Sequence, residues 1–204
     1  IIASALSYYK TDAILKVKNV ERYDDRDDIR TNLLEAYMRL TDFIKKHIND
    51  KFYIEEGQRI NVRDIIAREL CVNLLVHREY SNPYPAKLII TKDNIVTENA
   101  NKLKMIGYID VNNYSPYPKN PKIAGFFKEI GLADELGSGI RKIAKYARIY
   151  STREPIFKDD EIFTATIPLT SKNSDEVYVS SAKLKELILE YIKSSIEGRT
   201  RHKI

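Results

Sequence analysis

The chain has few of the residues that form covalent cross-links or metal sites. Its 204 residues include one cysteine, Cys71, and three histidines that lie far apart in the sequence. A single sulfur cannot form an intrachain disulfide or a zinc site built from several thiolates. The histidines lack the close spacing of metal ligands. We therefore expect no metal held by protein ligands alone, and we expect Cys71 to be a buried structural thiol.

Long apolar runs are also absent. No segment approaches the roughly 18 consecutive apolar residues that are needed to cross a bilayer. The apolar start at residues 1–6 is shorter than the core of a signal peptide. These absences predict a cytoplasmic protein with no membrane partner. The first residue is Ile1 rather than methionine, and we expect the chain to begin inside a longer protein that has an upstream domain.

The residues that are present can build a sizeable domain. Hydrophobic residues make up 43% of the chain, which is enough for a core. The formal net charge of +5 permits contact with nucleic acid. Lysine and arginine are scattered along the chain rather than clustered, so the charge alone assigns no function.

The pattern along the chain predicts a connector, a main domain and a C-terminal segment. Residues 3–18 are typical of one or two strands, and the acidic run at residues 23–28 is expected to break them. Residues 1–28 would then connect the upstream domain to a main domain at residues 29–170. Residues 171–204 are expected to form a polar linker and an amphipathic helix, which either packs on its own domain or dimerises the chain.

Helices and a hairpin are expected in the first half of the main domain. Apolar residues at helical spacing predict helices over residues 28–48 and 61–77, and Asn61 is expected to cap the second. Residues 86–91 and 94–98 predict a β-hairpin, because two short apolar strands flank a turn.

The second half begins with a long polar loop at residues 99–118, which is typical of a lid or a mobile segment. A helix is expected to start at Pro121 with Asn120 as its cap, because proline is favoured at the first helical position. Gly137, Ser138 and Gly139 are expected to open the next helix, whose inner face would hold Ile140, Ile143, Ala144 and Ala147. A strand is expected at residues 161–169.

Three polar residues form a ridge on the otherwise apolar helix at residues 61–77. Glu69, Asn73 and His77 are spaced four residues apart and so share one helix face. One interpretation is internal: the three groups are satisfied by hydrogen bonds within the protein. The other is chemical: Glu69 acts as a general base, and Asn73 gives an oxygen to Mg²⁺, which prefers hard oxygen ligands together with phosphates.

The two glycines after residue 136 also allow two interpretations. Gly137 and Gly139 leave room for close backbone approach, and the amides at the start of a helix attract phosphate. A simple turn between two helices would need the same residues. Arg78 and Lys119 could contact phosphate or DNA, but as isolated cations they are expected to be solvated.

These motifs resemble a known family. The Glu69–Asn73 spacing is that of the N-box of GHKL ATPases, and residues 68–81 are similar to a longer signature of the RecG-related transcriptional regulators. Residues 119–121 resemble the Arg-Asn-Pro of that family, and residues 131–140 resemble its Gly-Leu-x-Glu-x-x-Gly-x-Gly-Ile. The resemblance covers residues 29–169.

The resemblance implies a fold and a set of partners. It implies a GHKL (Bergerat, HATPase_c-type) domain of the α/β class, an α+β sandwich in which helices cover one face of a mixed sheet. It also implies an upstream Schlafen/AlbA-like DNA-binding domain, so that DNA would be bound by other parts of the full-length protein while this part self-associates. The basic tail at residues 199–203 would contact nucleic acid, belong to the start of a winged helix, or be a frayed terminus.

The resemblance further implies ATP and Mg²⁺ as cofactors. Glu69 would be the catalytic base and Asn73 the magnesium ligand. The remaining residues that would bind the cofactor are His77, Lys119, Asn120, Gly137, Ser138 and Gly139.

One segment departs from the family pattern. Residues 99–101 are Asn-Ala-Asn where the family has Asn-Pro-Gly, at the position that resembles the adenine-binding box of GHKL proteins. The acidic residue and the glycine of that box are missing. We therefore expect a nucleotide-binding-like regulatory and dimerisation module rather than an efficient ATPase. An active ATP hydrolase that uses Glu69 and a purely structural self-association domain are the alternatives, and without a P-loop nothing indicates a helicase.

Overall fold

The computed structural model describes residues 9–18, 21–101, 106–114, 119–133 and 138–169, together with Leu189. The chain divides into two compact units, residues 1–172 and 173–204. The first unit is described below. Gly137 and the predicted C-terminal helix, apart from the helical Leu189, lie outside the described residues.

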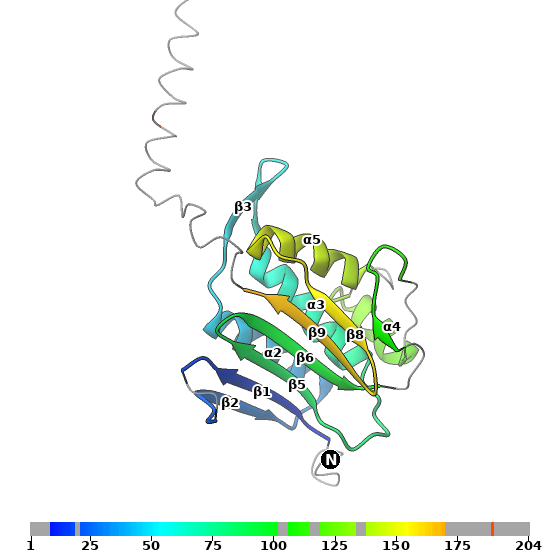
Figure 1. The fold of residues 1–204 in the computed structure, drawn as a ribbon. Coiled ribbons are helices and arrows are strands. Elements are labelled where there is room, and N and C mark those ends of the chain that lie inside the picture. Colours follow the sequence, from blue (N-terminus) through cyan, green and yellow to red (C-terminus); the bar gives the residue numbers. More distant parts are fainter. Residues whose placement is uncertain are drawn as a thin grey trace, which may run out of the picture. The chain divides into compact units, whose positions relative to one another are not determined.

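A seven-stranded mixed sheet forms one layer of the first unit, in the order β2-β1-β5-β6-β9-β8-β7 (Figure 1). The neighbouring strands pair antiparallel except β1 and β5, which are parallel. The strands are β1 (Thr11–Lys16), β2 (Asp25–Ile29), β5 (Ala86–Thr91), β6 (Asn94–Ala100), β7 (Gly107–Tyr108), β8 (Ile156–Asp159) and β9 (Ile162–Pro168). Strands β1 and β2 come from the stretch that was predicted to be a connector.

The helices lie on one side of this sheet and form the second layer (Figure 1). They are α2 (Leu33–His47), α3 (Val62–Val76), α4 (Pro121–Glu129) and α5 (Gly139–Ser151). Helix α3 is central and packs against α2, α4 and α5. The predicted fold, a mixed sheet with helices on one face, is therefore confirmed. No helix among the described residues is long and apolar enough to cross a membrane.

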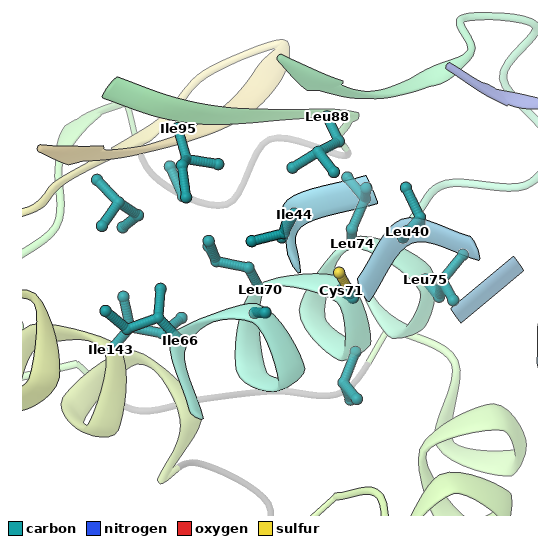
Figure 2. Packing of buried hydrophobic residues seen from close by; sticks show 14 of the residues in the cluster. Leu40, Ile44, Ile66, Leu70, Cys71, Leu74, Leu75, Leu88, Ile95 and Ile143 are labelled. Atoms are coloured by element: carbon teal, nitrogen blue, oxygen red, sulfur yellow. The ribbon is translucent and has the colours of Figure 1, made fainter. Parts of the chain in front are cut away.

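The core lies between the two layers. Figure 2 shows Leu70 and Leu74 of α3 directed toward Leu88 of β5 and Ile95 of β6, with Ile44 of α2 beside them. All five side chains are almost fully buried. Residues of β5 alternate between this core and the other face of the sheet, as the period of two of a strand requires. The alternation explains why the hairpin at residues 86–98 was predictable.

The expectation that the acidic run would break the strands is wrong. Residues 25–28 of this run belong to the edge strand β2, because basic side chains of α2 bind the carboxylates of Asp25 and Asp27. Asp25 lies 2.8 Å from Lys46 Nζ and 2.7 Å from His47 Nε2, and Asp27 pairs with Arg39. Helix α2 consequently begins later than predicted, after Asn32, whose side chain accepts a hydrogen bond from the Glu35 amide at 2.9 Å.

A second, two-stranded sheet was not predicted. Strands β3 (Phe52–Glu55) and β4 (Gln58–Asn61) form a hairpin that projects from the body (Figure 1). Its two-residue turn has positive φ at both positions, 50° at Glu56 and 78° at Gly57, as a type I′ turn requires. Because β4 runs directly into α3, Asn61 does not cap that helix with its side chain, contrary to the prediction.

The predictions for the second half are largely confirmed. Helix α4 begins at Pro121 and α5 begins at Gly139, and all four residues of the predicted inner face of α5 are buried. Strand β9 spans most of residues 161–169. The expected capping of α4 by the Asn120 side chain is wrong, since that side chain makes no bond to its own helix.

Candidate functional site

Helix α3 carries the predicted polar ridge through the middle of the molecule. Glu69 is only 4% exposed, although it is a carboxylate, and Asn73 is partly buried. The adjacent face of α3, about 100° around the helix, carries Leu70 and Leu74 into the core. A buried carboxylate is costly unless other groups compensate its charge, so the surroundings of Glu69 decide its role.

The start of α5 lies against this ridge at very short range. A methyl group at Gly139 would be 3.2 Å from Glu69 Oε2 and 3.3 Å from each of the two amide atoms of Asn73. Carbon atoms rarely approach polar atoms so closely, and glycine is the residue that permits it. The structure therefore brings together three of the predicted site residues, Glu69, Asn73 and Gly139.

Cationic groups surround the Glu69 carboxylate. Arg68 Nη2 lies 3.3 Å and Lys142 Nζ 3.8 Å from Glu69 Oε1. The N-terminus of α5, which bears partial positive charge, is also adjacent. These groups offset the cost of burying the carboxylate, as the internal interpretation of the ridge expects.

The side chain of Asn73, unlike that of Glu69, has no partner that would satisfy it within the described protein. Within the described part of the chain, its side-chain amide makes no hydrogen bond. Its backbone carbonyl accepts a hydrogen bond from the His77 amide at 3.0 Å. A partly buried amide without a partner is available to a ligand. The amide of Asn73 is thus the polar group of the ridge that is best placed to bind something other than protein.

His77 lies at the C-terminal end of α3, away from the contact with Gly139. Burial lowers the pKa of His77 to about 4, and the nearby charge of Lys119 acts in the same direction. The imidazole is therefore neutral at neutral pH. It could offer a hydrogen bond to a ligand but not a charge.

Lys119 and Asn120 bind protein atoms near the same end of α3. The Asn120 amide donates to the carbonyl oxygens of Val76 and Arg78, both at 2.8 Å. Lys119 donates to the side-chain oxygen of Asn101. The predicted site residues thus form two groups along α3: Glu69, Asn73 and Gly139 at the first, and His77, Lys119 and Asn120 at the second. Ser138 precedes α5, and its carbonyl accepts from the Lys142 amide.

Asn99 is a polar residue of the interior whose role the sequence did not reveal. It is 2% exposed, and its amide nitrogen donates to the Leu74 carbonyl at 2.9 Å. Its side-chain oxygen is buried and has no hydrogen-bond partner among the described residues. A buried acceptor without a donor is costly in a folded protein. Asn99 is the one residue of this segment that matches the Asn-Pro-Gly of the family pattern, and that match was the signal available in the sequence.

Arg78 was expected to be solvated, and this expectation is wrong. The side chain is 3% exposed and lies over the rings of Tyr9 and Tyr80, at 5.5 and 5.3 Å from the ring centres. Its Nη1 atom donates to the Lys10 carbonyl at 2.8 Å. Burial lowers the pKa of Arg78, although a guanidinium stays charged. Arg78 is therefore a structural tie between β1 and the end of α3 and not a surface ligand for phosphate.

Three further observations concern ligands and reactive groups. A cavity of about 10 Å³ beside Arg78 has room for a single water, so it is no nucleotide site. No group of three or more His, Cys, Asp or Glu side chains in the described residues could hold a metal. Cys71 is fully buried as predicted, and burial raises the pKa of its thiol.

Comparison with known families concerns the part of the chain that follows α3. Residues 85–167 match the family model described as "Putative ATP-dependent DNA helicase recG C-terminal". This match supports a GHKL-like C-terminal domain of RecG-related proteins in this part of the chain. The match includes Lys119, Asn120 and Gly139 but does not include α3, so the roles of Glu69 and Asn73 remain predictions. The family supports a nucleotide-binding-like domain.

A solved structure has a similar fold. The DIP2311 protein from Corynebacterium diphtheriae superposes with a TM-score of 0.64 over 79% of this chain and 35% of that chain, at 13% sequence identity. The chain therefore spans about a third of that protein, and a likeness at this identity concerns the fold alone. No curated protein matches the chain in sequence.

Proposed function

We propose that this RecG C-terminal-type domain is a nucleotide-binding regulatory module of a DNA-binding transcriptional regulator. The observation that carries the proposal is the close contact of Gly139 with Glu69 and Asn73. A glycine at the start of a helix, a buried carboxylate and an available amide meet at one point. A helix N-terminus favours phosphate groups, and an amide oxygen is a hard ligand for a divalent cation.

The residues present fit ATP with Mg²⁺. A magnesium ion commonly takes one or two protein ligands and completes its shell with phosphate oxygens and water. Asn73 would supply such a ligand, and the amides at the start of α5 would face the phosphates. The bound ion would neutralise phosphate charge.

The charges around Glu69 favour binding over turnover. A general base must be free to accept a proton from water. Glu69 Oε1 instead lies 3.3 Å from Arg68 Nη2 and 3.8 Å from Lys142 Nζ, so this oxygen is already engaged by two cationic side chains. Sensing of a bound nucleotide, rather than efficient hydrolysis, is therefore the function that this arrangement supports best.

A thermal-shift titration with ATP and ADP, with and without Mg²⁺, tests the proposal. A ligand at 100 times its Kd should raise the free energy of unfolding by about 2.7 kcal/mol. We expect Asn73→Ala to abolish the magnesium-dependent part of the shift. Asn112→Ala is the control, because Asn112 is exposed in a loop. The proposal fails if millimolar nucleotide produces no shift, or if Asn73→Ala and the control respond alike.

Turnover and regulation need separate measurements. Phosphate release by the wild-type chain, compared with Glu69→Gln, distinguishes a sensor from a hydrolase: turnover that is lost in Glu69→Gln would assign hydrolysis instead. If nucleotide regulates the protein, as proposed, the full-length protein should bind DNA with an affinity that depends on nucleotide. Equal DNA affinities with and without nucleotide would contradict that part alone.

A further inference from the structure

Two basic side chains share one oxygen of the Glu69 carboxylate. Arg68 Nη2 lies 3.3 Å and Lys142 Nζ 3.8 Å from Glu69 Oε1. The other oxygen, Oε2, faces Gly139, where an added methyl group would be 3.2 Å away. Among these three charged side chains, two positive charges therefore meet one negative charge. They lie against the start of α5, which also bears partial positive charge.

Lys142 stands one turn after Gly139 on helix α5. Residues three apart on a helix share a face, so Lys142 is on the face of α5 that Gly139 turns toward α3. A helical side chain leans toward the N-terminus of its helix and covers the turn before its own position. The ammonium group of Lys142 consequently lies beside the first turn of α5, where it reaches Glu69 on the neighbouring helix α3 (Figure 1).

Lys142 and Arg68 contact Glu69 in different ways. The Arg68 guanidinium donates a hydrogen bond at 3.3 Å. The 3.8 Å between Lys142 Nζ and Glu69 Oε1 is beyond hydrogen-bond range, so this contact is ionic only. The ammonium is a compact charge on a flexible stem, and 33% of the Lys142 side chain is exposed. Transfer of Lys142 from Glu69 to a nearby anion breaks no hydrogen bond with Glu69, whereas transfer of Arg68 breaks one.

The proposed nucleotide site would bring phosphate to the same point. Asn73 would hold Mg²⁺ there, and in many nucleotide-binding proteins this ion bridges the β- and γ-phosphate oxygens of a triphosphate. Gly139 links the two features: a methyl group on it would be 3.3 Å from the Asn73 amide atoms, and it stands one turn before Lys142. Lys142 is therefore a cation beside the place that the terminal phosphates would occupy.

We propose that Lys142 is a phosphate-binding residue, which moves from Glu69 to the terminal phosphates of a magnesium-bound nucleoside triphosphate. Arg68 would stay on Glu69, so the buried carboxylate keeps a cationic partner in both states. The domain would distinguish a triphosphate from a diphosphate by the phosphate oxygens that Lys142 contacts. This inference rests on the proposed nucleotide site and adds the class of ligand that the site senses.

The first test compares the affinities for ATP and ADP, both with Mg²⁺, by calorimetric titration of the full chain. Lys142→Met removes the charge and keeps most of the stem. Loss of one charge-assisted contact should weaken ATP binding about tenfold to a hundredfold and ADP binding by a smaller factor. Lys145→Met is the matched control, because Lys145 lies on the same helix, is 54% exposed and pairs with Glu55. It should change the ratio of the two affinities by less than about twofold.

The outcomes separate this inference from the nucleotide site on which it rests. If the ratio of ATP to ADP affinity in Lys142→Met equals that in Lys145→Met, the inference is overturned and the site stands. A wild-type chain that binds neither nucleotide would refute both. Lys142→Arg keeps the positive charge and should keep the preference for ATP, whereas a residue that only offsets the charge of Glu69 would leave that preference unchanged in every variant.

The second test removes the competing carboxylate and leaves the cation in place. Glu69→Gln keeps the shape of the side chain but has no charge to hold Lys142, so ATP affinity should rise about twofold or more. Part of this gain requires Lys142 and should be lost when Glu69→Gln is combined with Lys142→Met, which a double-mutant cycle measures. An equal gain with and without Lys142, or weaker ATP binding by Glu69→Gln, would show that Lys142 does not pass between the carboxylate and phosphate. Melting temperatures without nucleotide verify that each variant is folded.

Discussion

The contact between Gly139 and the polar ridge of α3 predicts the effect of one added methyl group. In Gly139→Ala the new carbon would lie 3.2 Å from Glu69 Oε2 and 3.3 Å from the Asn73 amide. Each distance is a few tenths of an ångström shorter than an ordinary contact. Either α5 moves away from α3, or the side chains of Glu69 and Asn73 turn aside.

Two opposing effects set the change in stability. Crowding of a packed site costs about 1–3 kcal/mol, whereas alanine is favoured over glycine in a helix by about 0.5–1 kcal/mol. The net loss should therefore lie between about 0 and 2.5 kcal/mol. Nucleotide affinity should fall by a larger fraction than stability does. The reason is that the methyl group would occupy the space between the helix start and the proposed magnesium ligand.

Gly125→Ala provides a matched control. Gly125 lies within α4, and a methyl group there would meet no atom within 4 Å. This variant should gain about 0.5–1 kcal/mol in stability and bind nucleotide like the wild type. Urea denaturation gives the stabilities, and calorimetric titration gives the affinities. If Gly139→Ala binds nucleotide as tightly as Gly125→Ala does, the close contact has no part in a binding site and the reasoning is refuted.

Three further predictions concern stability. The pKa of His77 is about 4 in the folded protein, against an ordinary value of 6.5. Between these two pH values the unfolded chain therefore binds more protons than the folded protein does. The free energy of unfolding should fall by about 3 kcal/mol as the pH drops from 6.5 to 4. His77→Gln should flatten that part of the pH profile measured by denaturation, and an unchanged slope would contradict the assignment. Arg78→Lys should cost about 1–3 kcal/mol, because the buried guanidinium bonds to a carbonyl and lies over two rings. Arg59→Lys, at an exposed arginine over the Phe52 ring, should stay within about 0.5 kcal/mol, and equal losses would argue against a tie at Arg78. Thr152 ends α5 with φ of 57°, so Thr152→Gly should raise Tm by relieving about 0.5–1 kcal/mol of backbone strain, and a lower Tm would show that no strain is stored there.

Much of the fold could be predicted from local patterns. Helices α3, α4 and α5 and the β5–β6 hairpin follow from apolar periodicity and from proline and glycine at their ends. Strand β2 could not be predicted in this way, because its aspartates become compatible with a strand only when Arg39 and Lys46 of α2 neutralise them. That compensation depends on tertiary contacts, which a local pattern does not contain.

The candidate site was predictable in part. The four-residue spacing of Glu69 and Asn73 fixes their common face on a helix, and the structure adds Gly139 to that face. The sequence could not predict that Arg78 is buried, because Tyr9, which it contacts, lies far away along the chain. It also could not predict the side-chain direction of Asn120, since a capping residue and a residue that bonds a neighbouring helix look alike in sequence.

The topology of the sheet has a consequence for how the two ends of the chain depend on each other. Within the described part of the sheet, three hairpins of neighbouring strands, β1–β2, β5–β6 and β8–β9, are joined by the β1–β5 and β6–β9 pairings. Helix α2 packs across the first junction, and the α3–α5 contact spans the second. A ligand held between α3 and α5 would therefore fasten one half of the chain to the other. If the chain were divided between residues 101 and 119, the two fragments should associate more tightly when nucleotide is bound.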